Sequence, residues 1–282
     1  MTLTYYSRAA TQAFWAEHWG GHSPAALARV AATSPLTDLL ARNLPPPGAT
    51  VLEAGCGLGQ YVVLLRERGY RAVGVDWATD SLHACRAWAK DTPLAAMDLG
   101  QLGFASGAFA AYVSLGVVEH DPAGPGRILA EAHRVLADGG TLLLSVPYVN
   151  LVRRLGARRI RRANERVRAA GGTFYQFAFS RGEVKAAVER AGFRVIGATP
   201  YDPARVLRGA WRRLQRRHER PAAATRPAAH ADTSLRATRE PLRGAAAAPA
   251  SHRVLGLVRR LLYTRPALHA FGHMILLVAV KR

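Results

Sequence analysis

The stretch that decides the fold is Val51-Leu52-Glu53-Ala54-Gly55-Cys56-Gly57-Leu58-Gly59, a short apolar run that ends in three glycines at alternate positions. The apolar run predicts a buried strand, and residues 61–69 predict a helix that ends at a glycine. Glycines between a strand and a helix permit a tight turn and let a ligand approach the backbone. The stretch therefore predicts a nucleotide-binding turn, although its GxGxG spacing differs from the GxGxxG of dinucleotide-binding folds.

Strands and helices continue to alternate on both sides of this turn. Further strands are predicted over residues 71–76, 93–97, 108–116, 141–147, 193–200 and 273–281. Helices are predicted over residues 81–90, 126–140 with a glycine stop, 151–168, 180–193 with Ser180 as N-cap and a glycine stop, 204–217 and 253–262, and throughout residues 1–44. This alternation over about 100 residues favours an α/β fold with a doubly wound parallel sheet.

Composition limits the class of protein. The 282 residues are 49% hydrophobic and 21% charged, which is typical of a globular chain with one large domain or two small ones. Two cysteines exclude a disulfide framework and a cysteine-rich zinc site, and no metal site is expected. No apolar run reaches the roughly 18 residues of a transmembrane helix, and the N-terminus lacks the pattern of a secretory signal. We therefore expect a cytoplasmic protein.

Three carboxylates lie at the predicted strand ends. Glu53 precedes the glycine turn, where an acid would repel a pyrophosphate but suits a cationic ligand. Asp76 ends the second strand, 21 residues beyond Gly55, and a carboxylate there can accept hydrogen bonds from both ribose hydroxyls. Asp98 follows the third strand and can accept from an adenine amino group. Each acid alone is equally compatible with a structural role, but together with the glycine turn they favour S-adenosylmethionine, which carries an amine and a sulfonium and no phosphate.

Four segments resemble class I S-adenosylmethionine-dependent methyltransferases, closest to the broad group that methylates small molecules and lipids: EAGCGLGQY at 53–61, VGVDWA at 73–78, MDLGQLGFASGAFAAYVSLGVVEH at 97–120 and RILAEAHRVLADGGTLLLSVP at 127–147. The resemblance is strong over residues 50–147 and loose over 174–200 and 272–281. It implies a seven-stranded, mostly parallel sheet of order 3-2-1-4-5-7-6 with an antiparallel last strand. It also implies that S-adenosylmethionine is bound by Glu53, Gly55, Gly57, Gly59, Asp76, Trp77, Asp98, Leu99 and Leu115.

His120, which follows the fourth predicted strand, is the candidate catalytic base, because folds of this kind direct that position toward the cofactor. A general base helps when the methyl acceptor is a hydroxyl. The alternative is that Glu119 and His120 only shape the pocket. Tyr148, Asn150 and Tyr175 lie near strand ends as candidate contacts for the acceptor, although a tyrosine at such a position is more often simply packed.

The chain divides into four expected segments: a helical lid at 1–48, a cofactor-binding core at 49–203, a basic helical insertion at 204–265 with a disordered linker at 221–252, and a closing strand at 266–282. The aromatic residues of the first segment allow two interpretations. They either form a lid over the cofactor or provide a face on which the segment docks, and their helical spacing favours the docking face. These residues are Tyr5, Tyr6, Phe14, Trp15 and Trp19.

Positive charge is concentrated after residue 150. Residues 50–150 carry a net charge of −3, whereas residues 151–282 contain 29 basic and 7 acidic residues, a net charge of +22. The predicted helices at 204–217 and 253–262 place apolar residues opposite arginines, which is typical of helices at an anionic membrane surface. The alternatives are that these helices pack on the sheet with their arginines in water, that the arginines hold RNA, or that they bind an anionic small molecule.

The sequence thus predicts an S-adenosylmethionine-dependent methyltransferase that acts on a small-molecule or lipid-like acceptor, with oxygen as the expected methylated atom. An RNA methyltransferase is the second hypothesis, although no aromatic-interleaved RNA-binding motif is visible. The third is a non-catalytic membrane- or nucleic-acid-binding protein on a methyltransferase fold, which the intact carboxylates oppose. The basic helices predict peripheral contact with the inner face of the membrane.

Overall fold

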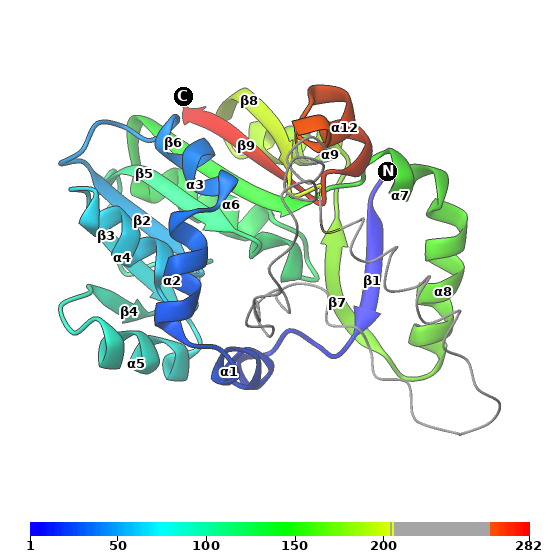
Figure 1. Ribbon diagram of the computed structural model, residues 1–282, viewed down its shortest axis with the longest axis horizontal. Helices are drawn as coiled ribbons and strands as arrows, with labels where there is room; N and C mark the ends of the chain where they lie inside the picture. Colours follow the sequence, from blue (N-terminus) through cyan, green and yellow to red (C-terminus); the bar gives the residue numbers. More distant parts are fainter. Residues whose placement is uncertain (204, 206–259) are drawn as a thin grey trace, which may run out of the picture.

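The computed structural model describes residues 1–203, 205 and 260–282, so the linker at 221–252 and most of the expected helices at 204–217 and 253–262 lie outside the described residues. Figure 1 shows a twisted central sheet with a separate two-stranded ribbon beside it. The central strands are β2 (Thr50–Ala54), β3 (Arg71–Asp76), β4 (Leu94–Ala96), β5 (Phe109–Leu115), β6 (Leu136–Pro147), β8 (Phe193–Tyr201) and β9 (Met274–Lys281).

The order of these strands across the sheet is β4-β3-β2-β5-β6-β9-β8. The pairs from β4 to β6 are parallel, whereas β9 runs antiparallel to both β6 and β8. Counted along the chain within this sheet, the order is the expected 3-2-1-4-5-7-6, and the predicted fold class is confirmed. Because β2, β3, β5 and β6 are parallel, their carboxyl ends meet at one edge, where α/β sheets bind ligands.

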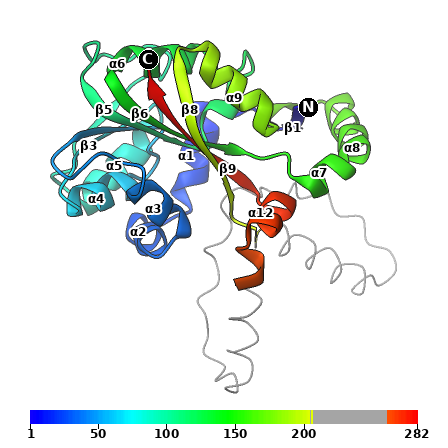
Figure 2. The ribbon, with the colours of Figure 1, turned by 90° about the horizontal axis from the view of Figure 1, so that it is seen from above.

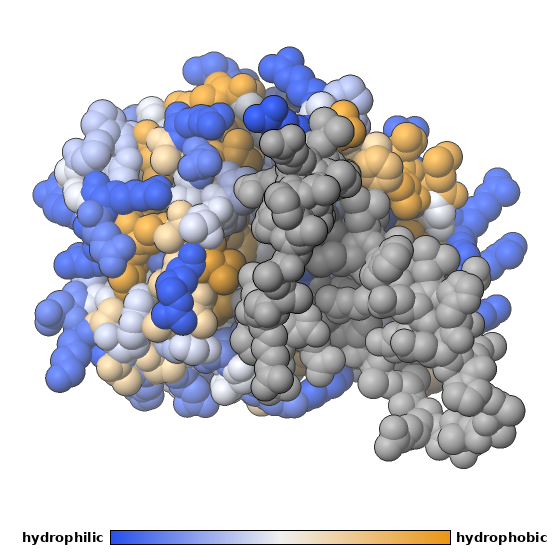
Figure 3. Space-filling view, viewed as in Figure 1, coloured by the Kyte–Doolittle hydropathy of each residue, from blue (hydrophilic) through white to orange (hydrophobic). Residues whose placement is uncertain are grey.

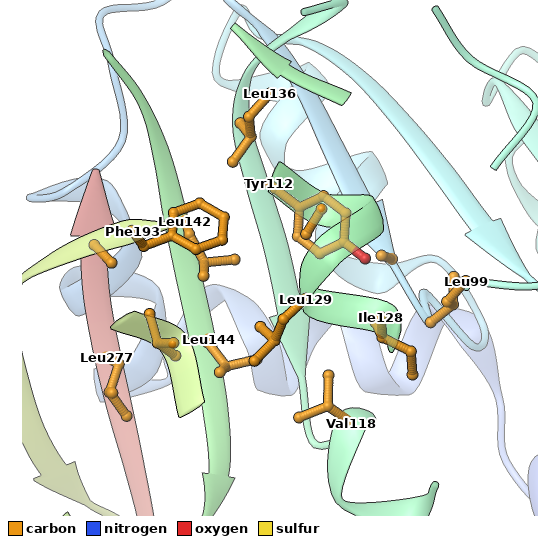
Figure 4. Close-up of a cluster of buried hydrophobic side chains, with 14 of the residues drawn as sticks. Leu99, Tyr112, Val118, Ile128, Leu129, Leu136, Leu142, Leu144, Phe193 and Leu277 are labelled. Atoms are coloured by element: carbon orange, nitrogen blue, oxygen red, sulfur yellow. The ribbon is translucent and has the colours of Figure 1, made fainter. Parts of the chain in front are cut away.

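Helices cover both faces of the sheet (Figure 2). One face packs against α3 (Pro35–Ala41), α4 (Gln60–Glu67) and α5 (Thr79–Trp88), and α2 (Pro24–Ala32) lies against α4 and α5. The other face packs against α6 (Gly126–Val135) and α9 (Arg181–Arg190), with the largest cluster of buried hydrophobic side chains between them and the sheet (Figure 4). Double coverage explains the nearly continuous apolar strands, because consecutive residues such as Leu142 and Leu143 enter opposite cores.

The first strand of the chain corrects one expectation. Residues 3–7 were expected to be helical, but β1 (Leu3–Ser7) is a strand that pairs antiparallel with β7 (Thr173–Ala178) in the ribbon. The aromatic sequence of β1 suits a strand, and Leu3 is buried against Val149 and Ala157. The first helix, α1, starts only at Gln12 and ends at Gly20.

Two helix ends test the sequence-based boundaries. The Ser180 N-cap of α9 is confirmed and forms a full capping box with Glu183. The expected glycine stop of the helix at 126–140 is wrong, because α6 ends at Val135 and Leu136 already has extended backbone angles. Leu136 is completely buried in the core, so its packing ends the helix before Gly139 is reached.

The remaining helices lie in the second half of the chain: α7 (Leu151–Leu155), α8 (Ala157–Ala169) and α12 (Arg265–Phe271). Figure 1 places α8 beside β1, on the side of the ribbon away from the central sheet. Among the described residues, no helix combines the length and the apolar character that crossing a bilayer requires.

Candidate active site

The glycine turn joins β2 to α4. Gly55, Gly57 and Gly59 all have positive φ angles, of 79°, 51° and 71°, which side chains of L-residues rarely adopt. At Gly57 the lack of a side chain also permits close packing, because a Cβ there would lie 2.6 Å from the ring carbon Cζ2 of Trp19. The turn therefore keeps the shape that the sequence predicts for a ligand-binding loop, and α1 lies directly on it.

Asp76 is held against this turn. Its Oδ2 accepts a hydrogen bond from the main-chain N–H of Gly57 at 2.8 Å, and its Oδ1 accepts from that of Ala78 at 2.9 Å. Burial raises the pKa of Asp76, and the amide hydrogen bonds oppose that rise. Each carboxylate oxygen can accept more than one hydrogen bond, so the fixed carboxylate keeps acceptor capacity for two ribose hydroxyls.

Glu53 is a buried carboxylate with unused hydrogen-bonding capacity. It is only 3% exposed, and its Oε2 has no hydrogen-bond partner in the described part of the chain. Burial raises the pKa of Glu53 well above its ordinary value. An unsatisfied buried acceptor costs about 1–3 kcal/mol, and a cationic donor would remove that cost. The site therefore fits S-adenosylmethionine, whose amine and sulfonium match this carboxylate.

Asp98, the expected partner of the adenine amino group, lies beside β4 and is paired with an arginine. Its Oδ2 is 2.8 Å from Nη1 of Arg127, and its Oδ1 accepts from the N–H of Gly100 at 2.8 Å. The hydrogen bond from Arg127 is the main reason that the pKa of Asp98 is lowered. Arg127 was not predicted, because nothing in its position at the start of α6 indicates an ion pair with a residue 29 positions earlier.

The other predicted cofactor residues differ in their exposure. Leu99 is buried, Leu115 is half-buried at the end of β5, and the Trp77 side chain is 47% exposed. The main-chain carbonyl of Trp77 accepts a hydrogen bond from Nε2 of Gln12 at 2.6 Å. This bond ties the start of α1 to the end of β3.

Helix α1 covers the carboxyl edge of the sheet. Besides the contacts of Gln12 with Trp77 and of Trp19 with Gly57, the Trp15 ring lies 5.0 Å from the ring of His120, edge to face. One short helix thus contacts residues that follow β2, β3 and β5. Of the five N-terminal aromatic residues, Phe14, Trp15 and Trp19 lie in α1, whereas Tyr5 and Tyr6 lie in the ribbon.

His120 ends the short 3-10 helix η1 (Val118–His120) that follows β5. Its Nδ1 lies 2.8 Å from the main-chain carbonyl oxygen of Tyr175 in β7, and the two side-chain rings are 5.0 Å apart. Because a carbonyl oxygen only accepts hydrogen bonds, Nδ1 carries the proton in the neutral imidazole, and Nε2 is its proton-accepting atom. The structure thus brings two of the predicted site residues together.

Glu119, next to His120, is a further buried carboxyl. It is 2% exposed, and its Oε2 has no hydrogen-bond partner within the described residues. Burial raises the pKa of Glu119 to about 8, so the group is mostly protonated at neutral pH. It was not predicted as a site residue, although an acid directly before the candidate base was the available signal.

Tyr148 and Asn150 follow β6 at the same edge of the sheet. Asn150 is completely buried, where its Oδ1 accepts from the N–H of Arg153 at 2.8 Å and its Nδ2 donates to the carbonyl of Gly272 at 2.9 Å. Its side chain therefore caps α7 and ties it to the start of β9. Tyr148 is half-buried and donates its main-chain N–H to the carbonyl of His273 at 2.9 Å.

Comparison with known proteins agrees with this geometry. A family model described as a methyltransferase domain matches residues 52–144, which run from β2 to β6. No curated protein matches the sequence.

Several solved structures share the fold. A S-adenosylmethionine-dependent methyltransferase from Mesorhizobium loti is 16% identical, with a TM-score of 0.54 over 89% of this chain and 99% of that chain. A S-adenosylmethionine-dependent methyltransferase from Archaeoglobus fulgidus is 16% identical, with a TM-score of 0.51 over 87% and 93%. Geranyl diphosphate C-methyltransferase from Streptomyces coelicolor A3(2), in complex with Mg²⁺, geranyl diphosphate and S-adenosyl-L-homocysteine, is 15% identical, with a TM-score of 0.52 over 88% and 78%.

At these identities the solved structures establish the fold, while the family model identifies the domain. Both agree with the glycine turn, the buried Glu53 and the amide-held Asp76, a combination that suits S-adenosylmethionine as methyl donor. Residues 52–144 of the chain therefore form a methyltransferase domain, on a fold that the chain shares with S-adenosylmethionine-dependent methyltransferases.

Proposed function

We propose that this methyltransferase acts on a small-molecule or lipid-like acceptor, that it methylates oxygen, and that His120 is the general base. The observation that carries the proposal is the hydrogen bond between Nδ1 of His120 and the carbonyl of Tyr175. It orients the ring and keeps its proton on Nδ1, so that Nε2 can take the proton of an acceptor hydroxyl. No metal ion is needed for this step.

The cofactor supplies an activated methyl group on a sulfonium. The protein then has to place the acceptor in line with that methyl and exclude water. In the proposal, Asp76 holds the ribose, Glu53 faces the cationic end of the cofactor, and Asp98, oriented by Arg127, accepts from the adenine amino group. Gly55, Gly57 and Gly59 let the backbone approach the ligand, while Trp77, Leu99 and Leu115 line the adenine and methionine ends.

We further propose that α1 is the lid of the site, as part of an N-terminal segment that spans residues 1–48. Its contacts with Gly57, Trp77 and His120 support this role, because a helix at that place separates the carboxyl edge from solvent. Tyr175 and Tyr148 are proposed to contact the acceptor. Asn150 would act indirectly, by holding α7 beside them.

The experiment that tests the substrate class uses the whole protein, methyl-labelled S-adenosylmethionine and a cell extract. The extract is afterwards separated into lipid, RNA, protein and small-molecule fractions. Label in the lipid or small-molecule fraction supports the proposal, whereas label in RNA replaces it with the RNA methyltransferase. Failure to bind S-adenosylhomocysteine, measured by calorimetry, would favour a non-catalytic binding protein.

A further inference from the structure

Helices α7 and α8 carry an unusual combination of exposed side chains. Three aliphatic residues of α7 are exposed, and Leu155 is 80% exposed. Six arginines follow within the thirteen residues of α8, with Glu165 as the only acid. We call this the α7–α8 surface and define it by Leu151, Val152, Leu155, Arg158, Arg159, Arg161, Arg162, Arg166 and Arg168.

The arginines face solvent because the other side of α8 is anchored. Ala157 and Ile160 pack into the small core beneath the helix, and Asn164 accepts a hydrogen bond from the N–H of Tyr6 at 3.1 Å. The Arg168 guanidinium also lies 5.9 Å from the centre of the Tyr6 ring. None of the six arginines of α8 forms an ion pair with a carboxylate of the described residues.

Figure 3 shows the two kinds of side chain next to each other, with an apolar patch over α7 and hydrophilic side chains projecting from α8 below it. Guanidinium groups bind phosphate through paired hydrogen bonds. A basic group near an anionic bilayer contributes about 1 kcal/mol, and aliphatic side chains gain free energy at the boundary of the acyl chains. A nucleic acid would use the arginines but would leave the exposed aliphatic residues in water.

From this juxtaposition we propose that the α7–α8 surface docks the protein onto a membrane that contains anionic lipid. The two-stranded ribbon links this surface to the active site. One side of the ribbon packs on α8 through Leu3 and Tyr5, and β7 contributes Tyr175, which binds His120. A docked protein therefore holds its site close to the bilayer. The idea that docking lets a lipid-like acceptor reach the active site rests on the proposed function, whereas docking to the membrane does not depend on it.

The test is co-sedimentation of the whole protein with phosphatidylcholine vesicles that contain or lack phosphatidylglycerol. We expect binding only to the anionic vesicles. The double variant Arg158→Glu/Arg162→Glu should lower the partition coefficient at least roughly tenfold. The matched control, Arg66→Glu/Arg71→Glu, makes the same change of net charge at exposed arginines of α4 and β3 and should change binding less than about twofold.

A second pair of variants tests the aliphatic part. Leu155→Asp should weaken vesicle binding several-fold, and Val30→Asp, at an exposed position of α2, should have a much smaller effect. Unchanged S-adenosylhomocysteine binding shows that each variant is folded, and no acceptor enters the assay, so its outcome is independent of the proposed function.

Three results would overturn the proposal: binding that does not require phosphatidylglycerol, equal losses in the two arginine pairs, or insensitivity to Leu155→Asp. Tighter binding to a single-stranded RNA than to anionic vesicles, with the same dependence on Arg158 and Arg162, would instead assign this surface to nucleic acid.

Discussion

Oδ2 of Asp76 lies 2.8 Å from the main-chain nitrogen of Gly57, so the carboxylate that ends β3 is bonded to the glycine turn that follows β2. Asp76 ends β3 and Gly57 follows the neighbouring parallel strand β2, so the bond lies at the carboxyl edge of the sheet. It fixes the carboxylate in advance and shapes the turn at the same time. In the proposed cofactor site, this one side chain therefore contributes both a charge and part of the geometry of the turn.

Replacing Asp76 by alanine should weaken the binding of S-adenosylhomocysteine at least roughly tenfold, since hydrogen bonds to a charged group contribute about 1.5–3 kcal/mol. Isothermal titration calorimetry measures the change directly. Asp80→Ala is the matched control, because Asp80 is exposed in the first turn of α5 and should not affect affinity. Equal affinities for the two variants would disprove the ribose assignment.

Glu119 makes stability depend on pH. In the folded chain its pKa is about 8, against an ordinary value of 4.5, because burial disfavours the carboxylate. Between these values the unfolded chain releases the proton first, so rising pH favours unfolding. The contribution of Glu119 to the free energy of unfolding is retained below pH 4.5 and falls progressively up to pH 8, by on the order of 4 kcal/mol.

The variant Glu119→Gln removes this titration. Urea unfolding of both proteins from pH 5 to pH 8 should show that the wild type loses stability relative to the variant as the pH rises. A constant difference across this range would mean that Glu119 is ionised in the folded protein, contrary to its burial.

The contact of Trp19 with Gly57 gives an optical test of the lid. A ligand that enters the glycine turn must alter the surroundings of this indole, so S-adenosylhomocysteine should change the tryptophan emission. In a Trp77→Phe background, which removes the indole proposed to line the adenine, the change should largely disappear on adding Trp19→Phe and persist on adding Trp88→Phe, which alters an indole at the end of α5. A ligand-induced change of undiminished size in Trp19→Phe/Trp77→Phe would argue that Trp19 does not lie over the cofactor.

The central sheet could be predicted because each of its strands is indicated by residues that are close together in the sequence. Each strand from β2 to β6 is a short apolar run, whereas the neighbouring helices repeat their apolar residues every three to four positions. The family resemblance supplied the order of the strands. Glu53 and Asp76 could be proposed as site residues for the same reason, since both interrupt or end apolar strands beside glycines.

The ribbon could not be predicted in the same way. β1 pairs with β7 across about 170 residues of sequence, as in the pair Leu3 and Ala178, and neither strand has an apolar run of its own. The same distance hid the bond between His120 and Tyr175, 55 residues apart, and the pair of Arg127 and Asp98. Asn150 is a different case, because its role depends on residues close to it in the sequence. This polar residue at the end of β6 caps α7, which lies within the helical range predicted from the sequence.

The most direct test of the account is the rate at which label passes from methyl-labelled S-adenosylmethionine to the organic-soluble fraction of a cell extract, measured for the wild type, His120→Gln and Tyr175→Phe. We predict a loss of roughly 10²–10⁴-fold for His120→Gln with S-adenosylhomocysteine affinity unchanged. Tyr175→Phe should lose far less, because its main-chain carbonyl remains to orient the ring. A His120→Gln enzyme that transfers the label at the wild-type rate would contradict the assignment of His120 as the base.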